Sequence, residues 1–101
     1  MRSAIAIAQS ALKTDDVPVG ALIVDSENNI ISTGFNEREA HQDPTAHAEI
    51  VAIRRAAQKL GTWRLDECKL VVTLEPCAMC AGAIAQSRIN TLIFGAWDEK
   101  A

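Results

Sequence analysis

The chain has 101 residues, of which 49% are hydrophobic and 23% are charged, as is typical of one globular domain. Thirteen acidic and ten basic residues give a formal net charge of −3, so the overall charge does not point to nucleic-acid binding. No apolar run approaches the roughly 18 residues of a membrane-spanning helix, and the N-terminus lacks the pattern of a secretory signal. We therefore expect a single soluble, intracellular domain over residues 1–101, with no membrane partner.

The N-terminal part of the sequence predicts a helix followed by a β-hairpin. Residues 1–13 are rich in alanine, isoleucine and leucine at helical spacings, and polar residues and Pro18 then interrupt the pattern. Residues 19–24 and 30–35 have the β-branched, apolar composition of strands, and turn-forming residues lie at 26–29 between them.

A polar loop over residues 36–43 separates this hairpin from a second predicted helix. Asp43 is a suitable N-cap, and Pro44 is a residue type favoured at the first helical position. We expect the helix to run to about Leu60, because Gly61 follows it and glycine commonly terminates helices.

The remaining elements alternate between strand and helix. Short apolar strands are predicted at residues 69–74 and 91–94, with a helix over residues 76–86 between them. A strand, helix, strand order favours a parallel, right-handed crossover. The chain is therefore predicted to be a layered α/β domain without internal repeats or linkers.

One group of residues has the composition of a metal site. Cys77 and Cys80 lie one helical turn apart at a predicted helix start, and His47 could supply a third ligand from the start of another helix. Cys68 and His41 have no obvious motif spacing to this group. Three protein ligands leave a fourth position for water, which is typical of catalytic rather than structural zinc sites.

Glu49 is a candidate proton carrier beside this metal site. It shares the apolar face of its predicted helix with Ile53, Ala56 and Leu60, where an unpaired carboxylate would be costly to bury. Next to an activated water it could accept a proton and pass it on. His47 and Glu49 would, however, be separated by about 200° on a regular helix, so irregular geometry at the helix start is required.

Two interpretations other than catalysis explain parts of the pattern. A zinc-stabilised binding module would need a fourth protein ligand, for which His41 and Cys68 are the remaining candidates. A thiol redox protein could use Cys77 and Cys80, but this interpretation gives no role to Glu49.

The combined motifs resemble those of the zinc-dependent nucleobase deaminases, and within this superfamily those of the bacterial tRNA-specific adenosine deaminases. The segments that carry the resemblance are Val17–Ala21, Gly34–Asn36, Asp43–Glu49, Val72–Ala83 and Ser87–Ile89. The resemblance implies a three-layer, cytidine-deaminase-like fold with a mixed central sheet and helices on both faces. It also implies hydrolytic conversion of adenosine to inosine at the wobble position of a tRNA anticodon loop, by a cytoplasmic homodimer with one zinc ion per subunit.

The resemblance also implies roles for individual residues. The positions that match the family are the zinc ligands His47, Cys77 and Cys80, the proton shuttle Glu49, the base contacts Asn36 and Ala48, and Val19 in the pocket wall. A deaminase of the same scaffold that acts on cytosine, cytidine or guanine remains an alternative, because the zinc site does not specify the base. The family continues beyond residues 95–101 into a last strand and C-terminal helices, which we expect this chain to lack.

Scattered residues could contact RNA. Arg38, Arg64 and Arg88 are candidate phosphate contacts, although arginines at such positions are more often solvated surface residues or members of structural ion pairs. Trp63 and Trp97 could stack on a base, although tryptophan more often fills a core.

Overall fold

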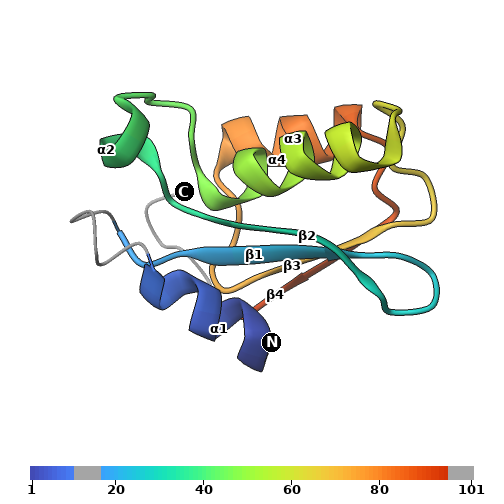
Figure 1. The fold of residues 1–101 in the computed structure, drawn as a ribbon, viewed down its shortest axis with the longest axis horizontal. Coiled ribbons are helices and arrows are strands. Elements are labelled where there is room, and N and C mark those ends of the chain that lie inside the picture. The colour runs from blue at the N-terminus through green and yellow to red at the C-terminus, as the bar shows by residue number, and fades with distance from the viewer. Residues whose placement is uncertain (11–16, 96–101) are drawn as a thin grey trace.

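A four-stranded sheet forms the middle layer of the computed structural model, which describes residues 1–10 and 17–95 (Figure 1). The elements in chain order are α1 (Arg2–Ala8), β1 (Gly20–Val24), β2 (Ile30–Phe35), α2 (Arg38–His41), α3 (Ala48–Leu60), β3 (Lys69–Val72), α4 (Ala78–Gln86) and β4 (Thr91–Phe94). The strand order is β2-β1-β3-β4. Strand β1 is antiparallel to both of its neighbours, whereas β3 and β4, joined through α4, are parallel. The predicted hairpin and parallel crossover are confirmed.

Helices cover both faces of this sheet. Helix α1 lies on one face, and α3 and α4 lie next to one another on the other (Figure 1). All five residues of β1 are consequently buried, as expected for a strand covered on both sides. Alternate residues of β1 serve the two faces: Ala21 and Ile23 belong to the core under α3 and α4, and Leu22 and Val24 to the core under α1. The predicted three-layer α/β architecture is therefore confirmed.

Two glycines allow the helices to approach the sheet closely. A β-carbon on Gly20 would collide with the carbonyl oxygen of Ala4 in α1. A β-carbon on Gly34 would lie 2.5 Å from the carbonyl oxygen of Ala48 and 2.8 Å from the amide nitrogen of Ala52. The first turn of α3 is thus held directly against the end of β2.

The start of α3 differs from the prediction. The helix begins at Ala48 rather than at Pro44, and the loop expected over residues 36–43 contains the short helix α2. Asp43 does not cap α3, because its Oδ1 accepts hydrogen bonds at 2.9 and 2.8 Å from the backbone amide and the hydroxyl of Thr45. This local Asx turn competes with helix formation, so Asp43 and Pro44 form a turn ahead of the helix.

Several other boundaries differ by a few residues. Helix α4 begins at Ala78 rather than at Pro76, and β3 ends at Val72 rather than at residue 74. Helix α1 extends to Ala8, and the predicted end at residue 13 lies outside the described residues. Helix α3 ends as predicted, with Gly61 in the left-handed conformation at φ 69°. Within the described residues, every helix is too short or too polar to cross a lipid bilayer.

Candidate metal centre

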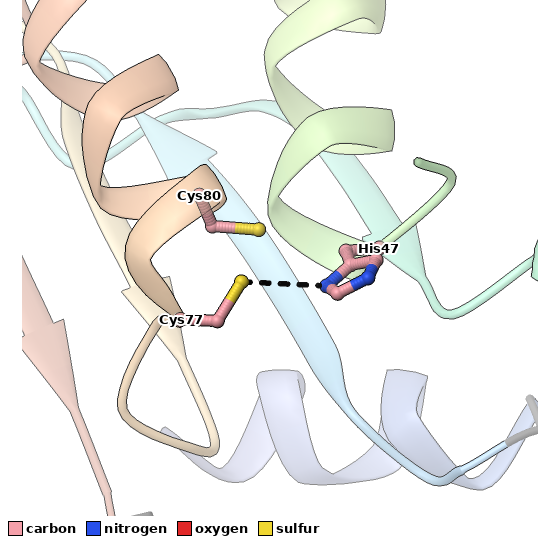
Figure 2. Close-up of side chains that lie close together, drawn as sticks. All are labelled: His47, Cys77 and Cys80. Atoms are coloured by element: carbon pink, nitrogen blue, oxygen red, sulfur yellow. Dashed lines mark hydrogen bonds between the residues drawn. The ribbon is translucent and has the colours of Figure 1, made fainter. Parts of the chain in front are cut away.

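His47, Cys77 and Cys80 meet where α3 and α4 begin (Figure 2). One ligand atom from each side chain lies within 4.8 Å of the others, and these three residues form the only such group among residues 1–10 and 17–95. His47 is the N-cap of α3 and Cys77 the N-cap of α4, both with extended backbone conformations. Residues far apart in the sequence are therefore brought together because two helices start at the same edge of the sheet.

The chemistry and spacing of these donors fit zinc. Nδ1 of His47 lies 3.8 Å from Sγ of Cys77, whereas two such ligands of a tetrahedral zinc ion are expected about 3.6 Å apart. A histidine nitrogen and two cysteine sulfurs are typical zinc donors. All three side chains converge without a rearrangement of the backbone, so this group could hold one zinc ion.

The loop before α3 fixes the position of His47. The amide of Ala46 donates to the carbonyl of Asp43 at 3.1 Å, and the amide of His47 donates to the carbonyl of Thr45 at 2.8 Å. The carbonyl of His47 accepts the amide of Val51 at 3.0 Å, which starts the hydrogen-bond ladder of α3. His47 thus sits at the point where a tight turn changes into a helix.

This geometry explains how His47 and Glu49 serve one site. His47 has φ −68° and ψ 154°, which is not helical, so the rotation of about 200° expected on a regular helix does not apply. Glu49 is the second residue of α3 and lines the same cavity as His47. The irregular helix start that the sequence required is confirmed.

Glu49 is buried, with 4% of its surface exposed. Burial raises the pKa of its carboxyl group, while its own backbone amide, the charge of His47 and a hydrogen bond from Cys80 act in the opposite direction. A carboxyl group that is easier to protonate than an ordinary glutamate is suited to hold a proton and release it.

Cys80 is completely buried. Burial, followed by the negative charges of Glu49 and Cys77, raises the pKa of its thiol far above the ordinary value. A thiol of this kind stays protonated in the metal-free protein, and ligation to a metal removes its proton. A buried thiol next to a carboxylate therefore favours a metal ligand over a free nucleophile.

A cavity of about 150 Å³ opens beside the three donors. Its lining comprises Val17, Val19, Asn36, Arg38, His47, Glu49, Leu74, Glu75 and Cys77. Val19 and Asn36, both expected at the substrate, are in this lining, whereas Ala48 is fully buried and is not. Leu74 and Glu75 were not singled out from the sequence, although they directly precede the Pro76-Cys77 motif.

Asn36 reaches both the cavity and the helix start. Its Oδ1 accepts a hydrogen bond at 2.9 Å from the backbone amide of Ala48, one of the amides that a helix start leaves unpaired. Because the oxygen is used in this way, the NH₂ group is the part of the Asn36 side chain that remains for a ligand. The cavity therefore contains a hydrogen-bond donor at a fixed place.

The other candidate RNA contacts are spread over the surface. Arg38 lines the cavity. Arg64 stacks over the ring of Trp63 at 5.6 Å and pairs with Asp66 at 3.2 Å, and Trp63 is 60% exposed rather than part of a core. Arg88 is exposed and has φ 68° in the turn after α4. Trp97 lies outside the described residues.

The two candidates for a fourth metal ligand lie elsewhere. Nε2 of His41 is 2.8 Å from Oε1 of Glu37. Cys68 is buried in the core near Leu65 and lines a different cavity. The described residues thus supply three ligands, and this argues against a metal site closed by four protein side chains.

A layered α/β fold with an open His-Cys-Cys site and a buried carboxylate defines a zinc domain of the deaminase type. Residues 1–96 match the family model of the cytidine and deoxycytidylate deaminase zinc-binding region. The chain belongs to this family.

The chain is also similar to individual proteins and solved structures. The chain is 51% identical to a tRNA-specific adenosine deaminase of Haemophilus influenzae over 100 residues, which cover 99% of this chain and 58% of the relative. It matches a structure from studies of A-to-I editing by tRNA:A34 deaminases with a TM-score of 0.96 and 46% identity, over 100% of this chain and 77% of the other. Guanine deaminase of Bacillus subtilis matches with a TM-score of 0.90 and 39% identity, over 95% and 61% of the two chains. The chain thus spans little more than half the length of the Haemophilus relative.

Proposed function

We propose that the chain is the zinc-binding domain of a hydrolase that deaminates adenosine to inosine at the wobble position of a tRNA anticodon loop. The observation that carries this proposal is the buried Glu49 in a small cavity beside three zinc-type donors. The 51% identity to a tRNA-specific adenosine deaminase favours this substrate.

The proposed chemistry divides between the metal and Glu49. A zinc ion held by His47, Cys77 and Cys80 supplies Lewis-acid activation of a water molecule. Glu49 accepts a proton from that water and donates it to the adenine ring nitrogen N1 as the water oxygen bonds to C6. It then takes the remaining proton of the new C6 hydroxyl group and passes it to the departing amino group. The C6–N bond breaks, ammonia leaves, and inosine remains. Glu49 is the only residue assigned a proton-transfer role.

The cavity is proposed to receive a single unstacked base. Its volume of about 150 Å³ is below the roughly 300–1,000 Å³ of pockets that hold drug-sized ligands, so the rest of the nucleotide would remain outside. We expect the NH₂ group of Asn36 to donate to a base acceptor and Val19 to form an apolar wall, since both residues line the cavity. Ala48 supports this arrangement through the hydrogen bond from its amide to Asn36. A loop presents such a base more readily than a duplex does.

We propose that the protein acts as a cytoplasmic homodimer with one zinc ion per subunit, residues 1–101 forming one domain. Helix α4 supports an interface, because it contains no charged residue. Ala78, Met79, Ala81, Gly82 and Ala85 are exposed on it. An uncharged helix surface beside a substrate cavity is suited to pack against a second subunit.

The proposed function can be tested with an anticodon stem-loop that bears a wobble adenosine. Inosine formation would be measured for this chain, for its Glu49→Ala variant, and for a version extended by the additional residues of the Haemophilus relative, with the zinc content of each determined. We expect about one zinc per chain and a loss of at least about 10²–10⁴-fold in rate without Glu49. Zinc-loaded proteins that form no inosine in either length would contradict the proposal.

Guanine deamination is the second candidate, because a guanine deaminase shares the fold with a TM-score of 0.90. The same proteins would be incubated with guanine, guanosine, cytosine and cytidine, and ammonia release would be measured. Turnover of free guanine but not of the stem-loop would replace adenosine by guanine as the substrate.

A further inference from the structure

An ion pair between a buried carboxylate and a half-exposed arginine lies next to the candidate site without lining its cavity. Glu37 is 5% exposed, and its Oε1 accepts a hydrogen bond at 3.2 Å from Nη2 of Arg55. Oε2 of Glu37 lies 3.1 Å from the same nitrogen and has no hydrogen-bond donor of its own. Burial of a carboxylate is costly unless it is paired. The presence of the buried Glu37 carboxylate beside the site therefore needs an explanation.

The partners of Glu37 connect three elements. Arg55 projects from α3, and its Nη1 also donates to the carbonyl of Thr33 in β2 at 3.2 Å. His41, at the end of α2, places Nε2 2.8 Å from Oε1 of Glu37. Glu37 and Arg55 together therefore tie α2 and β2 to α3.

Glu37 also closes the loop that carries His47. Its backbone amide donates to the carbonyl of Ala46 at 2.9 Å, and Ala46 directly precedes His47. The residue before Glu37 is Asn36, whose Oδ1 accepts the amide of Ala48 at 2.9 Å. Residues 36 and 37 are thus attached to α3 at its first turn through Asn36 and at its second turn through Arg55.

We propose that Glu37 and Arg55 are positioning residues, which hold the loop over residues 36–47 so that the Asn36 amide and the His47 ring face the same cavity. Neither side chain takes part in the chemistry. A displaced loop would move a metal donor and a base contact together, because both are anchored through Glu37. The proposal concerns the geometry of the metal-free site, and only the expected change in substrate binding rests on the proposed function.

The first test follows backbone amides in the metal-free protein by hydrogen exchange. Glu37→Gln removes the charge and keeps the shape of the side chain, and we expect exchange of the backbone amides at positions 37 and 48 to accelerate about tenfold. Amides of the central strand β1 should change by less than about twofold, since they report opening of the whole domain. A uniform acceleration of all these amides would show general destabilisation and would overturn the proposal.

The second test measures metal affinity by titration with Co²⁺, a zinc substitute with visible absorption. We expect Glu37→Gln and Arg55→Lys to raise the dissociation constant about tenfold, the lower end of the effects seen for residues around metal ligands. In an active preparation, KM for the stem-loop should rise about tenfold while kcat changes less, because a base contact is displaced and Glu49 is unaltered.

Two further variants keep the result interpretable. Arg64→Ala is the control, because Arg64 pairs at 3.2 Å with Asp66 in an exposed ion pair that lies outside the loop over residues 36–47. If Glu37→Gln does not fold, Glu37→Gln combined with Arg55→Met removes both charges, which is tolerated better than leaving one unpaired. Co²⁺ affinity and Ala48 exchange equal to those of the wild type in this double variant would overturn the proposal. A wild-type protein without inosine formation would instead count against the proposed function alone.

Discussion

Oδ1 of Asn36 accepts a hydrogen bond at 2.9 Å from the backbone amide of Ala48, so a residue at the end of β2 pairs the first amide of α3. The same residue lines the cavity, and its NH₂ group is the part of the side chain that remains for a ligand. One residue thus serves the stability of the helix start and the chemistry of the cavity, and substitutions can separate these two roles.

Asn36→Ala removes both roles, whereas Asn36→Asp retains the acceptor and removes the donor. We expect Asn36→Ala to lower the free energy of unfolding by about 1–2 kcal/mol, since it leaves a helix-start amide unpaired. Asn36→Asp should be closer to the wild type in stability but should raise KM for the stem-loop at least about tenfold. Urea unfolding and steady-state kinetics measure the two effects. An Asn36→Asp enzyme with unchanged KM would show that the amide does not contact the base.

Replacing the metal ligands should separate metal binding from packing. We expect His47→Ala, Cys77→Ser and Cys80→Ser each to weaken zinc binding by roughly 100-fold or more, because each removes one of three protein donors. Cys68→Ala is the control, since Cys68 is also buried but lies outside the donor group. Competition with a chromophoric chelator measures the affinities. Equal losses for Cys68→Ala and Cys77→Ser would argue against this donor set.

Glu49→Gln should stabilise the metal-free protein in a pH-dependent manner. Burial raises the pKa of Glu49 above its usual value of 4.5, so the folded state holds this proton more tightly than the unfolded state does. Stability from this group is therefore greatest below pH 4.5 and is lost as the pH rises through the raised pKa.

The glutamine variant does not lose stability in this way. Its free energy of unfolding should exceed that of the wild type by about 1–3 kcal/mol at neutral pH, and this difference should shrink towards pH 4. Urea unfolding of the chelator-treated proteins between pH 4 and pH 8 measures the effect. A constant difference across this range would mean that the Glu49 charge is not the cause.

Two glycine substitutions test how closely α1 packs on the sheet. Gly20→Ala should cost about 1–3 kcal/mol or more, because the added carbon collides with the backbone of α1 at Ala4. Gly82→Ala is the control, since a β-carbon there meets nothing within 4 Å, and it should add about 0.5–1 kcal/mol through helix propensity. Thermal unfolding distinguishes the two outcomes. Equal midpoints for both variants would contradict the close contact.

The periodic elements of the fold could be predicted from the sequence, because their signals are local. The apolar β-branched segments gave β1 and β2, and Gly61 marked the end of α3. The start of α3 could not be predicted in this way, because Asp43 uses its carboxylate on Thr45 and this choice depends on the turn around Pro44. The sequence predicts a loop over residues 36–43, although residues 38–41 form the short helix α2.

The residues of the candidate site could be predicted from the sequence more readily than the residues that surround it. The spacing of Cys77 and Cys80 and the resemblance to deaminases indicated the donor set. The roles of Glu37 and Arg55 had no sequence signal, because Glu37 lies in a polar segment and Arg55 in a helix that carries several charges. Only the three-dimensional structure shows that the buried carboxylate of Glu37 contacts Arg55.

His47 and Cys77 are the N-cap residues of the two neighbouring helices α3 and α4. An ion bound by both residues would cross-link them and close the segment between residues 47 and 77 into a loop. Such closure reduces the freedom of the unfolded chain in the same way as a disulfide bond across a loop of comparable length, an effect of about 3–4 kcal/mol. A metal ion at this site would thus also stabilise the packing of α4 on the rest of the domain. Removal of the ion by a chelator should therefore increase opening at the starts of α3 and α4 before it affects the central strands.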